Sequence, residues 1–208
     1  MRKLWRWMCR LIAWFFIRVR VIGLENFPSQ GPLLIVTNHV GDADVILSLA
    51  FLPVQPDGFA KAELYDYPLL GILMRAYGMI WVHRGRADRR AIRAALKGLQ
   101  EKRFVAVAPE GRESLTGGLE SGTNGAAYLA LKADVPLLPI TFTGTENGIF
   151  YPNLKRLRRT PMTLTIGPLF RLDPYDSRQE SIRCGTEKIM FKLAQQLPAK
   201  YQGVYRFK

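Results

Sequence analysis

The side chains best suited to chemistry in this sequence are a histidine and an aspartate five positions apart, His39 and Asp44. A neutral imidazole can accept a proton from an alcohol near pH 7, and a carboxylate on its other ring nitrogen fixes its tautomer and orientation. On a regular helix the two residues would lie about 140° apart, so they can meet only if His39 occupies a loop and Asp44 the first helical turn. The apolar runs on either side of the pair predict this placement.

A second aspartate, Asp42, is nearer to His39 in the sequence and competes for the same imidazole. Either aspartate could instead only cap the N-terminus of the following helix, because Asp is a favoured N-cap residue. The residues alone therefore indicate general-base chemistry as a hypothesis, with two possible carboxylate partners.

Another polar segment, Pro109-Glu110-Gly111-Arg112, follows the apolar run FVAVA. A strand that ends in this segment places a carboxylate and a guanidinium at the end of the sheet where its strands terminate. The planar guanidinium matches the geometry of a phosphate group. The plainer alternative is a polar turn with a surface ion pair.

A third segment, which runs from Gly78 to Arg84, also ends an apolar run with a cation. It contains the second of the two histidines, His83, for which the sequence shows no obvious carboxylate partner. We expect a structural or substrate-facing role for His83. A fourth segment, Val135–Ile140, is apolar with two prolines and predicts an edge strand or the start of a strand.

The elements that must position these residues alternate between short β-rich runs and helical stretches, which predicts an α/β fold with a mostly parallel sheet flanked by helices. In such sheets ligands bind where strands end and helices begin, and the polar segments fall at those points. The predicted strands are 33–37, 58–62, 79–83, 104–108, 137–142 and 163–167, and the predicted helices are 43–51, 68–77, 87–102, 123–133 and 178–197.

The N-terminal residues 1–22 predict an amphipathic helix that docks in a membrane interface. Six of the first 20 residues are Lys or Arg, the first acid is Glu25, and three tryptophans suit a headgroup boundary. The longest uncharged run, Leu11–Ile17, is far shorter than the ~20 residues that span a bilayer. A core helix with solvent-reaching arginines is the alternative. We therefore divide the chain into a docking helix, 1–22, and a catalytic domain, 23–208.

The composition narrows the functional classes. The 208 residues are 48% hydrophobic and 23% charged, which is typical of a globular domain. The net charge of +13 indicates a polyanionic partner, such as an anionic membrane, a phosphorylated substrate or a nucleic acid. The nucleic-acid class is disfavoured because the aromatic residues concentrate in the N-terminal helix. Two distant cysteines and two histidines predict no disulfide framework and no metal site, and they suit a reducing compartment.

The four segments, in this order, resemble those of the glycerol-phosphate and lysophosphatidate acyltransferase superfamily between about Gly23 and Gly167. The matching residues are Asn38, His39 and Asp44; Gly78, Trp81, Val82 and Arg84; Pro109, Glu110 and Gly111; and Val135, Pro136 and Pro139. Two departures affect the acceptor side. In the first, Ala108 stands where the family often has Phe, and Arg112 follows Gly111 directly. In the second, the stretch 120–125 lacks a Phe-Lys pair that the family often shows there.

The resemblance implies an O-acyltransferase in phospholipid biosynthesis whose His39–Asp44 pair activates the hydroxyl of a lysophosphatidate-type acceptor. It also implies a site for the acceptor's phosphate, made by Lys61, Arg84, Glu110, Gly111 and Arg112. The donor would be the thioester of acyl-CoA or acyl carrier protein, used as a co-substrate, with no further cofactor.

Two rival functions stay open. One is the same chemistry on another lipid acceptor, such as an aminolipid or glycolipid, and the other is a non-catalytic lipid-binding protein on this fold. For the favoured function we expect a peripheral protein on the cytoplasmic face of an anionic membrane.

Overall fold

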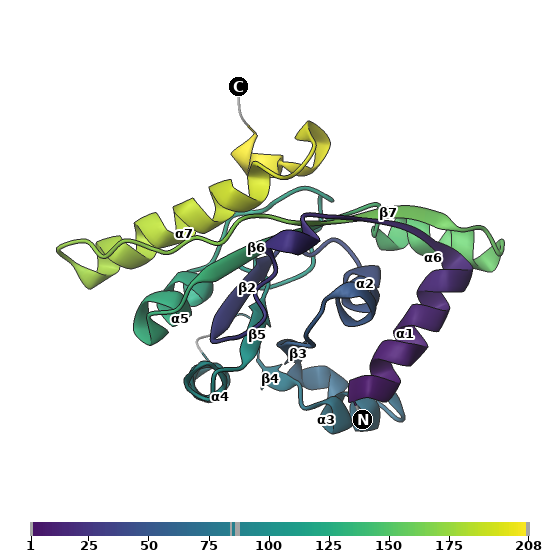
Figure 1. Cartoon of the computed structure of the whole chain (residues 1–208), viewed down its shortest axis with the longest axis horizontal. Coiled ribbons are helices and arrows are strands. Elements are labelled where there is room, and N and C mark those ends of the chain that lie inside the picture. Colours follow the sequence, from purple (N-terminus) through teal and green to yellow (C-terminus); the bar gives the residue numbers. More distant parts are fainter. Residues whose placement is uncertain (1, 84, 86–87, 207–208) are drawn as a thin grey trace.

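The computed structural model describes residues 2–83, 85 and 88–206 (Figure 1). Its centre is a seven-stranded sheet in the order β1-β7-β6-β2-β5-β3-β4. Neighbouring strands run parallel except for the antiparallel pair β6 and β7. The strands are β1 (Ile17–Ile22), β2 (Leu33–Thr37), β3 (Asp57–Lys61), β4 (Ile80–Val82), β5 (Phe104–Val107), β6 (Leu137–Thr143) and β7 (Thr160–Ile166). The predicted α/β fold with a mostly parallel sheet is confirmed.

Helices cover both faces of the sheet, and each face has its own apolar core (Figure 1). One face packs against α4 (Arg89–Gln100), α5 (Gly125–Ala133) and α7 (Arg178–Ala194). The other packs against α1 (Arg2–Phe16), α2 (Ala43–Phe51) and α6 (Asn147–Lys155). The remaining helix, α3 (Leu70–Tyr77), precedes β4, and short 3₁₀ turns span 24–26, 62–64, 199–201 and 203–205. The central strand β2 is buried between the layers, as its run of Leu, Ile and Val predicts.

The predicted elements and the observed ones agree best on either side of the segment that holds His39 and Asp44. Strand β2 and helix α2 begin and end at the predicted residues, 33–37 and 43–51. The other predicted strands and helices are present with shifted ends. Boundaries shift because helix and strand ends depend on capping and pairing that the apolar pattern does not specify.

Two elements were not predicted. Residues 17–22, assigned from the sequence to the docking segment, form strand β1, which pairs in parallel with β7. Their alternation of apolar and basic residues has the period of a strand, with Ile17 buried and Arg18 exposed. Helix α6 was missed because it contains Pro152 and begins with Asn147-Gly148, which are poor helix formers.

Arginines of helix α1 form hydrogen bonds with the C-terminal end of α2. Arg6 donates to the carbonyl oxygens of Leu52 and Pro53, each at 2.7 Å, and Arg10 donates to that of Ala50 at 2.9 Å. These carbonyls belong to the C-terminal end of α2, where the helix dipole favours a cation. Arg6 and Arg10 therefore stabilise the packing of α1 on α2.

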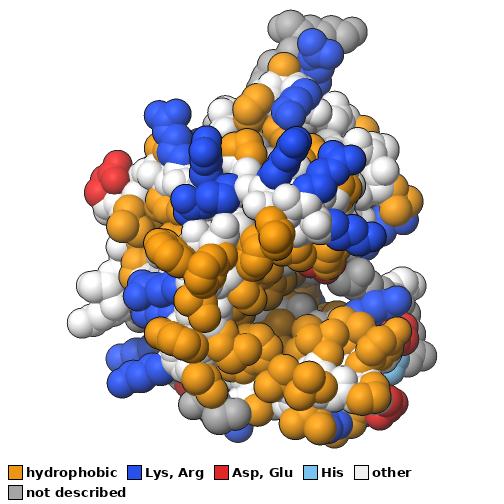
Figure 2. Space-filling model, turned by 90° about the vertical axis from the view of Figure 1, so that its right-hand side faces the viewer, with side chains coloured by type: hydrophobic (Ala, Val, Ile, Leu, Met, Phe, Trp, Pro, Cys, Tyr) orange, Lys and Arg blue, Asp and Glu red, His pale blue; other side chains and the backbone are white. Residues whose placement is uncertain are grey.

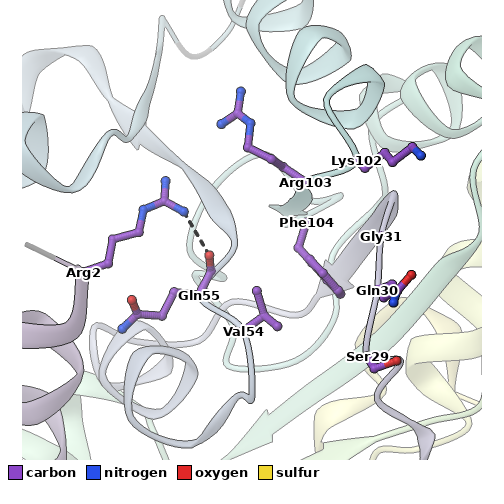
Figure 3. A pocket seen from close by; sticks show the side chains of 9 residues that line it. All are labelled: Arg2, Ser29, Gln30, Gly31, Val54, Gln55, Lys102, Arg103 and Phe104. Atoms are coloured by element: carbon purple, nitrogen blue, oxygen red, sulfur yellow. Dashed lines mark hydrogen bonds between the residues drawn. The ribbon is translucent and has the colours of Figure 1, made fainter.

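A recess of about 450 Å³ lies where β2, β3 and β5 begin, and Arg2 of α1 reaches its wall (Figure 3). Arg2 donates to the carbonyl oxygen of Gln55 at 3.1 Å and pairs with the buried carboxylate of Asp57, which also pairs with Arg103. The recess lies at the amino ends of these strands, whereas the residues that follow β2 and β5 lie at the carboxyl ends.

The outward face of α1 is apolar and exposed. Its exposed apolar side chains are Leu4, Trp7, Met8, Leu11, Trp14 and Phe15. Figure 2 shows hydrophobic side chains gathered around a hollow on the side of the molecule at the right of Figure 1, with Lys and Arg side chains above them. In the described part of the chain, no helix has both the length and the hydrophobicity to span a bilayer.

Candidate active site

His39 and Asp44 meet where β2 gives way to α2. His39 follows the strand in the connecting loop, Asp44 is in the first turn of the helix, and His39 Nδ1 lies 2.9 Å from Asp44 Oδ2. This is the arrangement that their spacing required. Because the Asp44 carboxylate is an acceptor when ionised, the imidazole proton is assigned to Nδ1 and the other ring nitrogen, Nε2, carries the lone pair.

The turn between the two residues holds the Asp44 carboxylate in place. Asp44 Oδ2 also accepts the backbone N–H groups of Val40 and Gly41, at 2.9 and 3.2 Å. Gly41 allows the close approach of another segment, since a Cβ there would lie 2.1 Å from the carbonyl oxygen of Thr145. The side chain of Asp44 is thereby oriented by the backbone as well as by the ring.

The competing aspartate, Asp42, is directed elsewhere. Its Oδ2 accepts the hydroxyl of Tyr151 at 2.7 Å, and its backbone N–H donates to Asn147 of α6. The hydrogen bond to Asp42, together with burial, raises the pKa of Tyr151 to about 12. Of the two aspartates, the structure therefore brings Asp44 to the imidazole and uses Asp42 to attach the loop to α6.

Asn38 anchors the start of the loop to the neighbouring strand. Its side-chain amide is buried, donates to the carbonyl oxygen of Phe142 at 2.9 Å and accepts the N–H of Phe142 at 2.8 Å. The motif contains Asn38, but its role was not foreseen because its partner is 104 residues away.

Glu110 forms a hydrogen bond with the backbone of His39. Its Oε1 accepts the backbone N–H of His39 at 3.3 Å and its Oε2 accepts that of Glu120 at 2.8 Å. Burial raises the pKa of Glu110 to about 7, outweighing the two N–H donors, which act in the opposite direction. The resemblance implied a phosphate-site role for Glu110, which stays a prediction. Its contacts in the structure support the loop that carries His39.

Arg112 extends from the same segment and is paired with an acid. Its Nε and Nη2 lie 3.1 and 2.7 Å from Glu120 Oε2. The backbone N–H of Leu115, and after it the hydrogen bond from Arg112, lower the pKa of Glu120. Gly111 adopts a φ of +76°, a conformation that favours glycine. The segment borders a cavity of about 540 Å³, which is lined by Glu110, Arg112, Thr116, Leu119, Glu120, Ser121, Gly203 and Val204.

The remaining expected phosphate ligands are less defined. Lys61 is the exposed last residue of β3, and it forms no ion pair with any of the described residues. Arg84 lies outside the described residues. Among the residues that the structure covers, there is no group of three His, Cys, Asp or Glu side chains arranged to hold a metal ion.

The structure corrects one expectation at His83, which does have a carboxylate partner. His83 Nδ1 lies 3.0 Å from Asp88 Oδ2, and the same oxygen accepts the backbone N–H of His83 at 3.1 Å. The spacing of five residues repeats that of His39 and Asp44, and this repeat was the signal in the sequence that could have revealed the second pair.

Comparisons with known proteins agree with this geometry. The profile of the family described as Acyltransferase matches residues 18–143. A 1-acyl-sn-glycerol-3-phosphate acyltransferase of Borreliella burgdorferi is 30% identical over 63% of this chain and 53% of its own length. The human alpha form of such an enzyme is 30% identical over 74% of this chain and 55% of its own length. The chain thus spans little more than half the length of these relatives.

A solved structure extends the match over nearly the whole fold. The crystal structure of the 1-acyl-sn-glycerophosphate (LPA) acyltransferase PlsC from Thermotoga maritima has a TM-score of 0.73 and 27% sequence identity. The match covers 94% of this chain and 79% of the other. The family match includes β2, α2 and β5, and hence both sides of the His39–Asp44 contact. This chain belongs to the acyltransferase family.

Proposed function

We propose that this protein transfers a fatty acyl group from a thioester to the free hydroxyl of a lysophosphatidate-type acceptor. The observation that carries the proposal is the 2.9 Å contact between His39 Nδ1 and Asp44 Oδ2 at the end of a parallel strand, within the region that matches the family. The printed names of the relatives supply the acceptor class.

The chemistry needs one base and no covalent enzyme intermediate. His39 Nε2 accepts the proton of the acceptor hydroxyl as its oxygen attacks the thioester carbonyl carbon. Asp44 holds the imidazole in the required tautomer and stabilises the imidazolium that forms. The C–S bond of the tetrahedral intermediate then breaks, and the leaving thiolate, whose conjugate thiol has a pKa near ~8.5, takes the proton back from His39. The products are the acyl ester and the free thiol.

The surroundings of the pair favour this role. Asp44 is almost fully buried, so its negative charge interacts strongly with the imidazolium. The imidazole side chain is 21% exposed and lies at the sheet edge where ligands bind in parallel α/β folds. The donor in this proposal is acyl-CoA or acyl carrier protein, either of which presents the same thioester.

One contact favours a second candidate, the same reaction on an acceptor without a phosphate. Arg112, an expected phosphate ligand, already pairs with Glu120. A lysophosphatidate phosphate would have to share Arg112 with Glu120 or displace that carboxylate. An aminolipid or glycolipid acceptor would require no such exchange.

An acceptor screen decides between the candidates. Full-length protein is incubated with labelled acyl-CoA or acyl carrier protein and with lysophosphatidate, an aminolipid or a glycolipid, and the lipid products are separated. Formation of labelled phosphatidate, lost in His39→Ala, supports the proposal. Acylation of only an unphosphorylated lipid would favour the second candidate. No labelled product from any acceptor would favour a non-catalytic lipid-binding role.

We further propose that the outward face of α1 holds the enzyme on an anionic membrane, at its cytoplasmic face. Trp7 and Trp14 are 61% and 66% exposed, and burying such side chains in the interface contributes roughly 25 cal/mol per Å². Because Arg6 and Arg10 bond to α2, docking would carry the active-site loop to the surface with α1. The acceptor could then enter from the leaflet.

Substitution tests this proposal better than deletion, because removing residues 1–20 would also remove most of β1. The double variant Trp7→Gln and Trp14→Gln should sediment less with anionic liposomes than the wild type, in high salt as well as low. The control, Leu169→Gln, replaces an exposed leucine that follows β7 and should sediment normally. Equal sedimentation of all three proteins would exclude this face of α1 as the anchor.

A further inference from the structure

The second histidine–aspartate pair has no part in the acyl-transfer step proposed above. His83 follows β4, an edge strand of the sheet, whereas His39 follows the central strand β2, with β5 and β3 between them. Both pairs lie at the carboxyl end of the parallel strands. The His83 pair therefore lies at the same carboxyl end of the sheet as His39, but three strands away from it.

Asp88 divides its two oxygens between two tasks. Its Oδ2 accepts the ring and backbone nitrogens of His83, and its Oδ1 caps α4 by accepting the backbone N–H groups of Arg90 and Ala91. The side-chain hydrogen bond with His83 is the largest cause of a strongly lowered pKa of Asp88, so the carboxylate is ionised near neutral pH. The contact at Nδ1 fixes the orientation of the ring and directs Nε2 away from the carboxylate.

The residues around the His83 pair suit the binding of an anion. The side chain of His83 is 40% exposed, and its Nε2 has no partner among the described residues. The first turn of α4 carries Arg89 and Arg90 and no acid, although the positive end of a helix dipole disfavours cations unless an anion is present. Lys61 ends the neighbouring strand β3, where it pairs in register with Val82.

We propose that His83, oriented by Asp88, forms a hydrogen bond through Nε2 with the phosphate of the acceptor and selects a phosphomonoester over a phosphodiester. This inference rests on the proposed function. A monoester has a second pKa near ~6, so near pH 7 it can share its second proton with Nε2 of His83. The shared proton forms a hydrogen bond between Nε2 and a phosphate oxygen, and a diester has no second proton with which to form it. Asp88 is a positioning residue in this arrangement, since it acts through the ring.

A binding experiment tests the site without turnover. The chain has two histidines, so protein labelled with ¹³C at histidine Cε1 gives two ring signals, which His83→Asn assigns. Glycerol 3-phosphate should shift the His83 signal saturably, while glycerol and the methyl diester of glycerol 3-phosphate should not. No shift, an equal shift with the diester, or a shift of the His39 signal alone would overturn the proposal.

Kinetics separate this role from a second base. His83→Asn keeps an amide near the position of Nδ1 but removes Nε2, and it should raise the KM for lysophosphatidate about tenfold with kcat little changed. His83→Gln, which restores a polar amide near the position of Nε2, should recover part of that loss. Asp88→Asn keeps a good N-cap for α4 and should raise KM by a smaller factor. An unchanged KM, or a fall in kcat alone, would contradict the assignment.

The two proposals fail in different ways. If the wild type forms phosphatidate and His83→Asn has wild-type kinetics, the role of His83 is wrong and the proposed function stands. If glycerol 3-phosphate shifts the His83 signal but the wild type forms no phosphatidate, the phosphomonoester site stands and the proposed function is wrong.

Discussion

The two histidine–aspartate pairs of this protein share their spacing, their Nδ1–Oδ2 contact and the sheet edge on which they lie, yet their surroundings differ. In the first, Asp44 is in the first turn of α2 and two backbone N–H groups of the preceding turn bind its Oδ2. In the second, Asp88 is the N-cap of α4 and divides its oxygens between the ring and the helix. His39 is the more buried of the two rings, with 21% of its side chain exposed against 40% for His83.

Under the two proposals, the spacing of the residues produces the contact and the location of each pair determines its use. The first pair follows the central strand of the sheet and has Glu110 beneath its backbone. The second pair follows an edge strand and has one cationic helix end beside it. A shielded, rigid imidazole suits proton transfer, whereas an exposed one suits binding of a charged phosphate group.

The largest effect should come from removing the ring of the first pair. His39→Ala should lower kcat by about 10²–10⁴-fold, the usual contribution of a general base. The measurement is the initial rate of labelled phosphatidate formation at saturating acceptor, with circular dichroism as the check on folding. A comparable loss of kcat in His83→Ala, with His39→Ala still active, would exchange the roles of the two pairs.

Replacing Asp44 should lower kcat far more than replacing Asp42. Asp44→Asn removes the charge that fixes the tautomer of His39 and should lower kcat by between about 10² and 10⁴-fold. Asp42→Asn is the matched control, because Asp42 bonds to Tyr151 rather than to the ring. Its effect on kcat should be much smaller. If Asp42→Asn were the more damaging of the two, Asp44 would not be the catalytic partner.

Glu110 should make stability depend on pH in a way that is specific to the first pair. Its pKa is raised from 4.5 to about 7, so between these values the folded protein holds a proton that the unfolded chain releases. The stability contributed by this group is full below pH 4.5 and is lost as the pH rises through 7, by about 3 kcal/mol in total.

Glu110→Gln cannot titrate and should flatten this decline. The measurement is the free energy of unfolding in urea at pH 5.0 and 7.5 for the wild type and the variant. The wild type should lose more stability than Glu110→Gln between the two pH values. Parallel changes in both proteins would show that Glu110 does not hold a proton in the folded state.

The smallest effect concerns Arg112, which would join the two pairs into one acceptor site. Arg112→Lys loses the planar fork and should raise the KM for lysophosphatidate by about three- to tenfold. Glu120→Gln should lower that KM, because it removes the carboxylate that now pairs with Arg112. Equal effects of Arg112→Lys on phosphorylated and unphosphorylated acceptors would show that Arg112 does not bind the phosphate.

Much of the site could be predicted because its key contact is local. His39 and Asp44 are five residues apart, and the strand before them and the helix after them have strong apolar patterns, which predict the loop and the first helical turn that let them meet. The choice of Asp44 over Asp42 as the partner came from the structure. The second pair was equally local. It was missed because the predicted helix 87–102 included Asp88, whereas in the structure Asp88 is the N-cap of α4 and contacts His83.

The sequence by itself determined the α/β class, the ends of β2 and α2, and the pairing of an imidazole with a carboxylate, since each depends on residues within about one turn or strand of each other. Only the tertiary structure decided which partners distant side chains have. Asn38 bonds to Phe142, Glu110 supports the backbone of His39, and β1 joins the sheet beside β7. Burial and long-range hydrogen bonds govern these choices, and neither is encoded in the spacing of neighbouring residues.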